Sequence, residues 1–201
     1  MITFNDSVFF TEKKNLKECI EREREQFAFH QSIPFNEYIS LRSEFLKAQQ
    51  NSELNLGYLE SFSPKIAVFA GSFNPFHKGH YNVLQKAEKI FDKVIIAFGK
   101  NPEKEERGNR IPNSIKNRQI EGYDGLLTDF ISSLHHDVVV IRGLRNSTDF
   151  NYEQNQYRYI QELMPEIKIV SIFCDKEFEH ISSSGIRTLE KYNKHQNYLL
   201  D

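Results

Sequence analysis

The sequence predicts an α/β protein built on a Rossmann-like, doubly wound parallel sheet, with a helical extension at its N-terminus. Two observations predict this class. Four short and almost wholly apolar segments lie at 65–70, 93–98, 137–142 and 168–173, and segments with helical spacing alternate with them. Parallel strands covered on both faces are apolar along their whole length, and the crossovers between them usually contain helices.

The first half of this sheet starts after a change in composition. The apolar run at 65–70 predicts a strand that ends at Gly71, and the segment 81–91 predicts the helix that follows it. A second strand is expected at 93–98. The segment 112–120 is then expected to be helical.

The second half repeats the alternation. Its longest helical pattern, 149–163, stops before Pro165, because the residue before a proline disfavours the helical conformation. The expected elements are, in order, a helix at 128–135, a strand at 137–142, the long helix at 149–163, a strand at 168–173 and a helix at 184–192.

The N-terminal part, residues 1–62, is more polar and more highly charged than the rest. Helical spacing of apolar residues predicts two helices there, at 14–29 and 35–46. We therefore expect a helical extension of unknown role at 1–62, followed by one α/β domain at 63–201.

Composition excludes several classes of protein. The 201 residues include 26 Lys and Arg and 28 Asp and Glu, a formal net charge of −2, which argues against a nucleic-acid or membrane partner. Cys19 and Cys174 are too few for a disulfide framework or a four-thiolate zinc site. No apolar run approaches the ~18 residues of a membrane span, and no leader segment is evident, so we expect a cytoplasmic protein.

The first candidate site is the signature loop, residues 71–80, which directly follows the first strand and reads GSFNPFHKGH. Glycines let backbone N–H groups approach an anion, and a helix that begins at Gly79 and His80 adds positive potential. The loop matches neither the glycine-rich lysine loop nor the dinucleotide motif GxGxxG. His77 and His80 could in principle bind zinc, but no third ligand is suitably spaced. A phosphate site is favoured.

The second candidate is the pair Arg142 and Arg145 at the end of the third apolar strand, beside Gly143. Guanidinium groups there suit phosphate binding. The alternative is that both arginines are surface residues paired with Asp149 and Glu153.

The third candidate is the serine turn, residues 178–184, whose hydroxyls could either bind phosphate or only cap a helix. Lys104 follows the second strand, where a lone lysine is usually solvent-facing. All these groups follow parallel strands, whose carboxyl ends share one edge of the sheet. They include no Ser–His–acid or Cys–His arrangement, so they indicate a polyphosphate site that works by charge stabilisation.

These motifs carry a resemblance. The signature loop resembles that of the HxGH nucleotidyltransferases, while RGLRNSTDFNYE (142–153) and HISSSGIR (180–187) are similar to the phosphopantetheine adenylyltransferase family. The resemblance covers about 65–192. It implies adenylyl transfer from MgATP to 4′-phosphopantetheine, giving dephospho-coenzyme A and pyrophosphate in coenzyme A biosynthesis. It also implies that Mg²⁺ is carried by ATP rather than by a protein metal site, and that the chain forms a homo-oligomer, a hexamer in the family.

The resemblance also implies roles for individual residues. His80, Lys104 and Arg145 match catalytic positions, and His80 matches the histidine that stabilises charge on the α-phosphate. The positions that match acceptor-binding ones are Ser72, Lys104, Leu127 and Arg142. Those that match ATP-binding ones are Ser72, Phe73, His77, Gly79, His80, Gly143, Leu144, Arg145, Glu153, Phe178, Glu179, His180, Ile181, Ser182, Ser183 and Ser184.

Two alternatives stay open. Asn74 and His77 replace the Asp and Thr usual in that family and match nicotinate or nicotinamide mononucleotide adenylyltransferases, so a sister transferase, or one with a cytidylyl donor, is an alternative. A non-catalytic sensor of nucleotide or coenzyme A, with residues 1–62 as its output, is the other.

Overall fold

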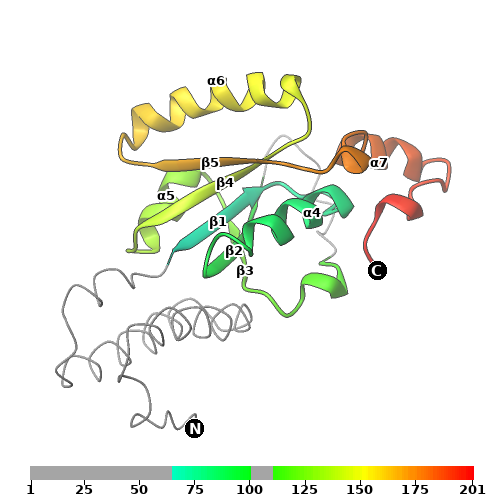
Figure 1. Cartoon of the computed structure of the whole chain (residues 1–201), viewed down its shortest axis with the longest axis horizontal. Coiled ribbons are helices and arrows are strands. Elements are labelled where there is room, and N and C mark those ends of the chain that lie inside the picture. Colours follow the sequence, from blue (N-terminus) through cyan, green and yellow to red (C-terminus); the bar gives the residue numbers. More distant parts are fainter. Residues whose placement is uncertain (1–64, 101–110) are drawn as a thin grey trace, which may run out of the picture.

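The computed structural model describes residues 65–100 and 111–201, so the predictions made for residues 1–62 and for Lys104 lie outside the described part. Five parallel strands form one sheet in the order β3-β2-β1-β4-β5 (Figure 1). The strands are β1 (Ile66–Gly71), β2 (Lys93–Gly99), β3 (Ile120–Tyr123), β4 (Val138–Leu144) and β5 (Lys168–Phe173).

Helices cover both faces of the sheet, as the sequence predicts for a doubly wound fold (Figure 1). One face packs on α4 and the other on α5 and α6. The helices in the described part are α4 (Lys78–Ala87), α5 (Leu127–Ser133), α6 (Ser147–Leu163) and α7 (Ser183–Glu190), with three short 3₁₀ helices, η1 (Asn113–Ile115), η2 (Lys176–Phe178) and η3 (Gln196–Tyr198).

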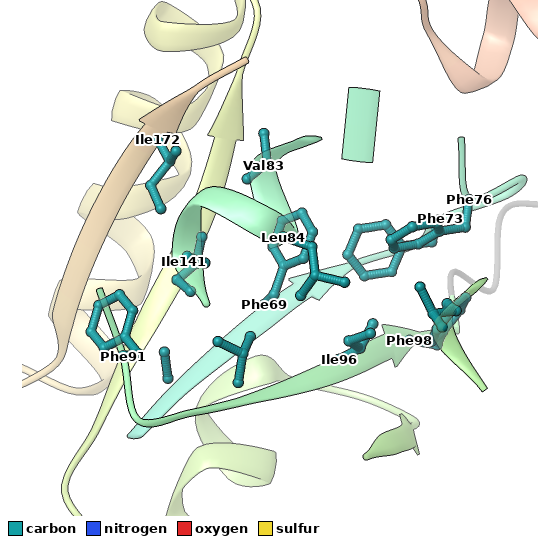
Figure 2. Close-up of a cluster of buried hydrophobic side chains, with 14 of the residues drawn as sticks. Phe69, Phe73, Phe76, Val83, Leu84, Phe91, Ile96, Phe98, Ile141 and Ile172 are labelled. Atoms are coloured by element: carbon teal, nitrogen blue, oxygen red, sulfur yellow. The ribbon is translucent and has the colours of Figure 1, made fainter. Parts of the chain in front are cut away.

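Strand β1 shows why the apolar runs do not alternate with polar residues. Ala67 and Phe69 belong to the buried cluster on the α4 face, and Ile66 and Val68 belong to the cluster on the α5–α6 face. Figure 2 shows the α4-face cluster, in which Phe69 lies below Leu84 of α4. Both faces of the strand are buried away from solvent, so every position in it is apolar.

The prediction of a helix at 112–120 is wrong. Only a 3₁₀ turn, η1, forms there, and Ile120 begins strand β3. Pairing with β2 decides this conformation, because Ile96 lies opposite Ile120 and Gly99 lies opposite Tyr123. A four-residue strand at a sheet edge has too short a pattern to be recognised from sequence.

Helix α4 begins at Lys78, earlier than the predicted 81, and ends at Ala87 rather than 91. The four apolar strands and the remaining helices lie within three residues of their predicted positions. None of the helices in the described part of the chain has the length and apolar character that crossing a membrane requires.

The order of the strands positions the functional edge. From β1 the chain moves outward through β2 and β3, then returns to place β4 on the other side of β1. The crevice between the carboxyl ends of β1 and β4 is thus the point where strand order reverses, which is where open parallel sheets bind ligands.

Candidate functional site

Of the four helices that follow the carboxyl ends of strands in the described part, three begin at the signature loop, the arginine segment and the serine turn. α4 follows β1, α6 follows β4, and α7 follows β5 after the turn η2. The first turn of a helix has N–H groups without intrahelical partners and carries partial positive charge. This edge therefore favours an anionic ligand.

Two imidazoles form the start of α4. His77 is the N-cap, and its Nδ1 accepts the backbone N–H of His80 at 3.4 Å, while Nδ1 of His80 accepts the backbone N–H of His77 at 3.3 Å. The rings stack with centroids 3.6 Å apart. Because each Nδ1 accepts a hydrogen bond, the proton of each neutral ring is on Nε2. The Nε2–H of His80 is then a potential donor for a ligand oxygen.

Both rings are neutral near pH 7. Burial, and secondarily the positive charge of Arg145, lower the pKa of His77 from 6.5 to about 4. Burial, followed by the influence of His77 and Arg145, also lowers the pKa of His80 well below 6.5. The His80 ring therefore carries a neutral N–H donor near pH 7 rather than a permanent positive charge.

An aromatic cluster packs against the His80 ring. The Phe73 ring lies 5.0 Å from the His80 ring, edge-on. It also lies 5.1 Å from the ring of Phe76, and Figure 2 shows these two phenylalanines side by side. Phe73 has a positive φ of 41°, and a Cβ atom at Gly71 would stand 2.8 Å from its ring. Phe73 was predicted to meet the nucleotide, but its side chain is 4% exposed and lies in the core.

Arg142 lies on the α5–α6 face of the sheet edge. Its Nε and Nη2 donate to the Glu153 carboxylate at 2.5 and 2.7 Å, and its Nη1 donates to the carbonyl of Ala70 at 3.2 Å. On the same face, Leu127 at the start of α5 packs against the buried cluster together with Tyr123. Arg142 is thereby held at one side of the strand ends.

Arg145 is held on the other side, toward α4 and α7. Its Nε and Nη2 donate to Asp149, both at 2.7 Å, and its Nη1 donates to the carbonyl of Ile181 at 3.3 Å. The bond with Asp149 raises the pKa of Arg145 further above its ordinary value. The ion-paired alternative is thus what the structure shows for Arg145, and the same is true of Arg142 with Glu153. Pairing orients each guanidinium and leaves it partly exposed, at 33% for the side chain of Arg145.

The serine turn lies against the signature loop. Ser182 caps α7 by accepting the N–H of Gly185 at 3.0 Å, and Ser183 donates from Oγ to the carbonyl of Pro75 at 3.0 Å. Arg187 of α7 also donates, from Nη1, to the carbonyl of Asn74. The serine turn is therefore both a helix cap and a tie between two site segments.

The predicted residues do not all reach the edge in the same way. The side chain of Leu144 is fully buried and that of Ile181 is 5% exposed, so each meets a ligand only through its main chain. The signature loop, both arginines and the serine turn are brought together, with Glu153 beside Arg142 rather than Arg145. Sequence reasoning missed Arg187, whose contact with Asn74 joins positions 113 residues apart.

The described residues contain no group of three or more His, Cys, Asp or Glu side chains that could hold a metal ion. The zinc arrangement weighed for His77 and His80 has no third ligand among them.

Comparison with known proteins gives consistent results. The cytidylyltransferase-like family model matches residues 68–189. A phosphopantetheine adenylyltransferase from Mycoplasma capricolum is 40% identical over 139 residues, which are 65% of this chain and 99% of the relative. Another from Levilactobacillus brevis is 35% identical over 136 residues, 63% of this chain and 84% of the relative.

Among solved structures, the bifunctional NMN adenylyltransferase/ADP ribose pyrophosphatase of Francisella tularensis, complexed with AMP and a Mn ion, matches with a TM-score of 0.44 and 19% identity. The match covers 68% of this chain and 44% of that one. A likeness this weak bears on neither the substrate nor the metal of this chain.

Proposed function

The chain belongs to the cytidylyltransferase-like family, and from this premise we propose that it transfers the adenylyl group of ATP to 4′-phosphopantetheine. The products are dephospho-coenzyme A and pyrophosphate, which makes the chain an enzyme of coenzyme A biosynthesis. The observation that carries the proposal is the 40% identity to a phosphopantetheine adenylyltransferase over 99% of that relative's length.

The geometry supports a reaction between two anions. A phosphate oxygen of the acceptor attacks the α-phosphorus of ATP, and the bond from that phosphorus to the β-phosphate oxygen breaks as pyrophosphate leaves. The acceptor phosphate is largely ionised at pH 7, so no strong base is needed. The protein must place two mutually repelling groups and neutralise charge on the transferred phosphoryl group.

We assign these tasks to opposite faces of the sheet edge. His80 donates from Nε2 to an oxygen of the α-phosphate, and Arg145 and the N-terminus of α7 neutralise the nucleotide phosphates. Arg142, on the α5–α6 face, receives the acceptor phosphate, and Leu127 and Tyr123 of the same face offer apolar surface to the pantetheine arm. Lys104, which lies outside the described residues, stays a proposed catalytic and acceptor-binding residue.

We propose that Mg²⁺ enters as part of the substrate MgATP. Support comes from the described residues, which offer no cluster of three ligands for it. Magnesium commonly binds through nucleotide phosphates with few protein ligands.

The mononucleotide acceptor suggested by Asn74 and His77 gains no support from the fold. His77 is 3% exposed and caps α4, so a structural task accounts for its presence. Asn74 is bound through its main-chain carbonyl to Arg187.

The test is pyrophosphate release from MgATP with 4′-phosphopantetheine and nicotinate mononucleotide assayed side by side. We expect turnover with phosphopantetheine and none with the mononucleotide. Turnover with the mononucleotide alone would reverse the acceptor assignment, and ATP binding without turnover would favour a sensor. We also propose that the chain is a homo-oligomer, a hexamer by resemblance, which light scattering on the purified protein would test.

A further inference from the structure

The C-terminal segment, residues 195–201, turns back from α7 to the signature loop (Figure 1). Leu199 forms an isolated antiparallel bridge with His77. Next to it, the Lys78 ammonium donates to the carbonyl of Asn197 at 2.8 Å. The segment therefore touches the loop at the two residues where α4 begins.

The same segment makes three further contacts, with the serine turn, with η1 and with the α4-face cluster. The Tyr198 ring lies 5.8 Å from the His180 ring of the serine turn, edge-on. The carbonyl of Asp201 accepts the N–H of Asn113 at 3.1 Å. Leu200 packs against the buried cluster that includes Phe73, the residue beneath His80.

Two elements therefore hold the signature loop in place, helix α7 and the C-terminal segment. Helix α7 holds the middle of the loop, through Arg187 to Asn74 and Ser183 to Pro75. The C-terminal segment holds its end at His77, whose Nδ1 in turn accepts the N–H of His80.

We propose that the C-terminal segment is a positioning element of the transferase site, which acts on His80 through His77. It rests on the proposed function, because the role of His80 is to meet the α-phosphate. The bridge at Leu199 fixes the backbone of His77 in the extended conformation of an N-cap, and Leu200 anchors the bridge in the core. The two imidazoles then keep the reciprocal hydrogen bonds between their Nδ1 atoms and backbone N–H groups. These bonds fix the direction of the His80 Nε2–H.

Catalysis makes such support necessary. A displacement of about 1 Å at a reacting group can lower a rate on the order of 10²-fold, so a donor must be held by its surroundings. Phe73 supports the His80 ring from below, and the C-terminal segment supports the backbone beside it.

The test compares two partly buried leucines that pack on opposite faces of the sheet. Leu200 and Leu134 are both partly buried, but Leu200 packs on the α4-face cluster and Leu134 on the α5–α6-face cluster. Leu200→Ala and Leu134→Ala should lower the urea midpoint to a similar extent. With MgATP and phosphopantetheine, kcat should fall about tenfold in Leu200→Ala alone, and Leu200→Met should restore most of it.

A second readout does not depend on activity. The pKa of the His80 ring, followed by NMR, should rise toward 6.5 in Leu200→Ala, because a loosened ring gains water, and should not move in Leu134→Ala. If the alanine variants fail to fold, Leu200→Val and Leu134→Val give the same comparison with a smaller loss of packing.

The outcomes separate this inference from the proposed function. Equal kcat in the two variants of an active enzyme, with equal His80 titration, would overturn the positioning role. A wild-type protein that is inactive with every acceptor would overturn the proposed function. In that case the His80 titration alone decides the positioning role: a shift confined to the Leu200 variant supports it, and an unchanged pKa refutes it.

Discussion

Acidification of the protein tests the state of the stacked imidazoles at the start of α4. Burial and the charge of Arg145 lower the pKa of His77 to about 4 in the folded state, against 6.5 for the free side chain. The unfolded chain therefore binds more protons than the folded one between these two values. Stability rises with pH across this window and is fully present only above about pH 6.5.

The size of the effect follows from the same two values. A fall in pKa from 6.5 to about 4 corresponds to roughly 3 kcal/mol over the whole window, at 1.36 kcal/mol per pKa unit. Between pH 7 and pH 5, the binding polynomial of this one group gives about 2 kcal/mol. This is a large share of a total stability on the order of 5–15 kcal/mol.

The matched variant is His77→Asn. Asparagine is a preferred N-cap residue, so α4 keeps its capping bond, but the titrating group is gone. Urea unfolding curves at pH 7, 6 and 5 should show the wild type losing at least about 2 kcal/mol more than the variant, because the variant lacks the His77 titration. Loss of the His77 ring also relieves part of the lowering of the His80 pKa, which acts in the same direction.

Parallel pH dependences of the two proteins would refute this reasoning. They would mean that His77 titrates with an ordinary pKa and that its ring is not held neutral by the fold. The His77 ring would then be largely charged at pH 6, and the neutral state that we assign to it there would be wrong.

Three further predictions concern other parts of the molecule. His80→Ala should lower kcat about 10²-fold with little change in the urea midpoint, as loss of a transition-state donor predicts; an equal loss of stability would make His80 structural. Gly71→Ala should destabilise the protein by about 1–3 kcal/mol and lower kcat, because the new Cβ would lie 2.8 Å from the Phe73 ring, and unfolding curves with assays check both. Glu88→Gln should destabilise by about 3 kcal/mol, because the carboxylate accepts Arg118 at 2.8 and 3.1 Å and both side chains are about 15% exposed; a midpoint within error of wild type would contradict this.

The sheet was largely predictable because burial on both faces leaves a pattern. Strands β1, β2 and β4 are apolar along most of their lengths, and each ends in or beside a glycine. β3 was not predictable, since Gly122 is exposed and the strand exists through its pairing with β2. Helix α4 begins one residue before Gly79, where the signature loop was expected to open a helix, although its N-cap is His77, which is not among the preferred capping residues.

The candidate site was likewise predictable in part. Parallel strands end at one edge, so the convergence of the signature loop, the arginines and the serine turn follows from topology alone. The contacts that join these segments do not follow from topology. The bond from Arg187 to Asn74 and the bridge from Leu199 to His77 join residues more than 100 positions apart, and no local pattern encodes them. Lys104 stays a prediction.

The end of strand β4 explains how two arginines three positions apart can serve two anions. Arg142 lies within β4, where side chains alternate between faces, and it meets Glu153 on the α5–α6 face. β4 ends at Leu144, so Arg145 lies in the bend that leads into α6, where it meets Asp149 and the carbonyl of Ile181 before α7. Because the chain leaves the sheet between the two arginines, their guanidinium groups reach different sides of the sheet edge, one for each phosphate that the proposed reaction must hold.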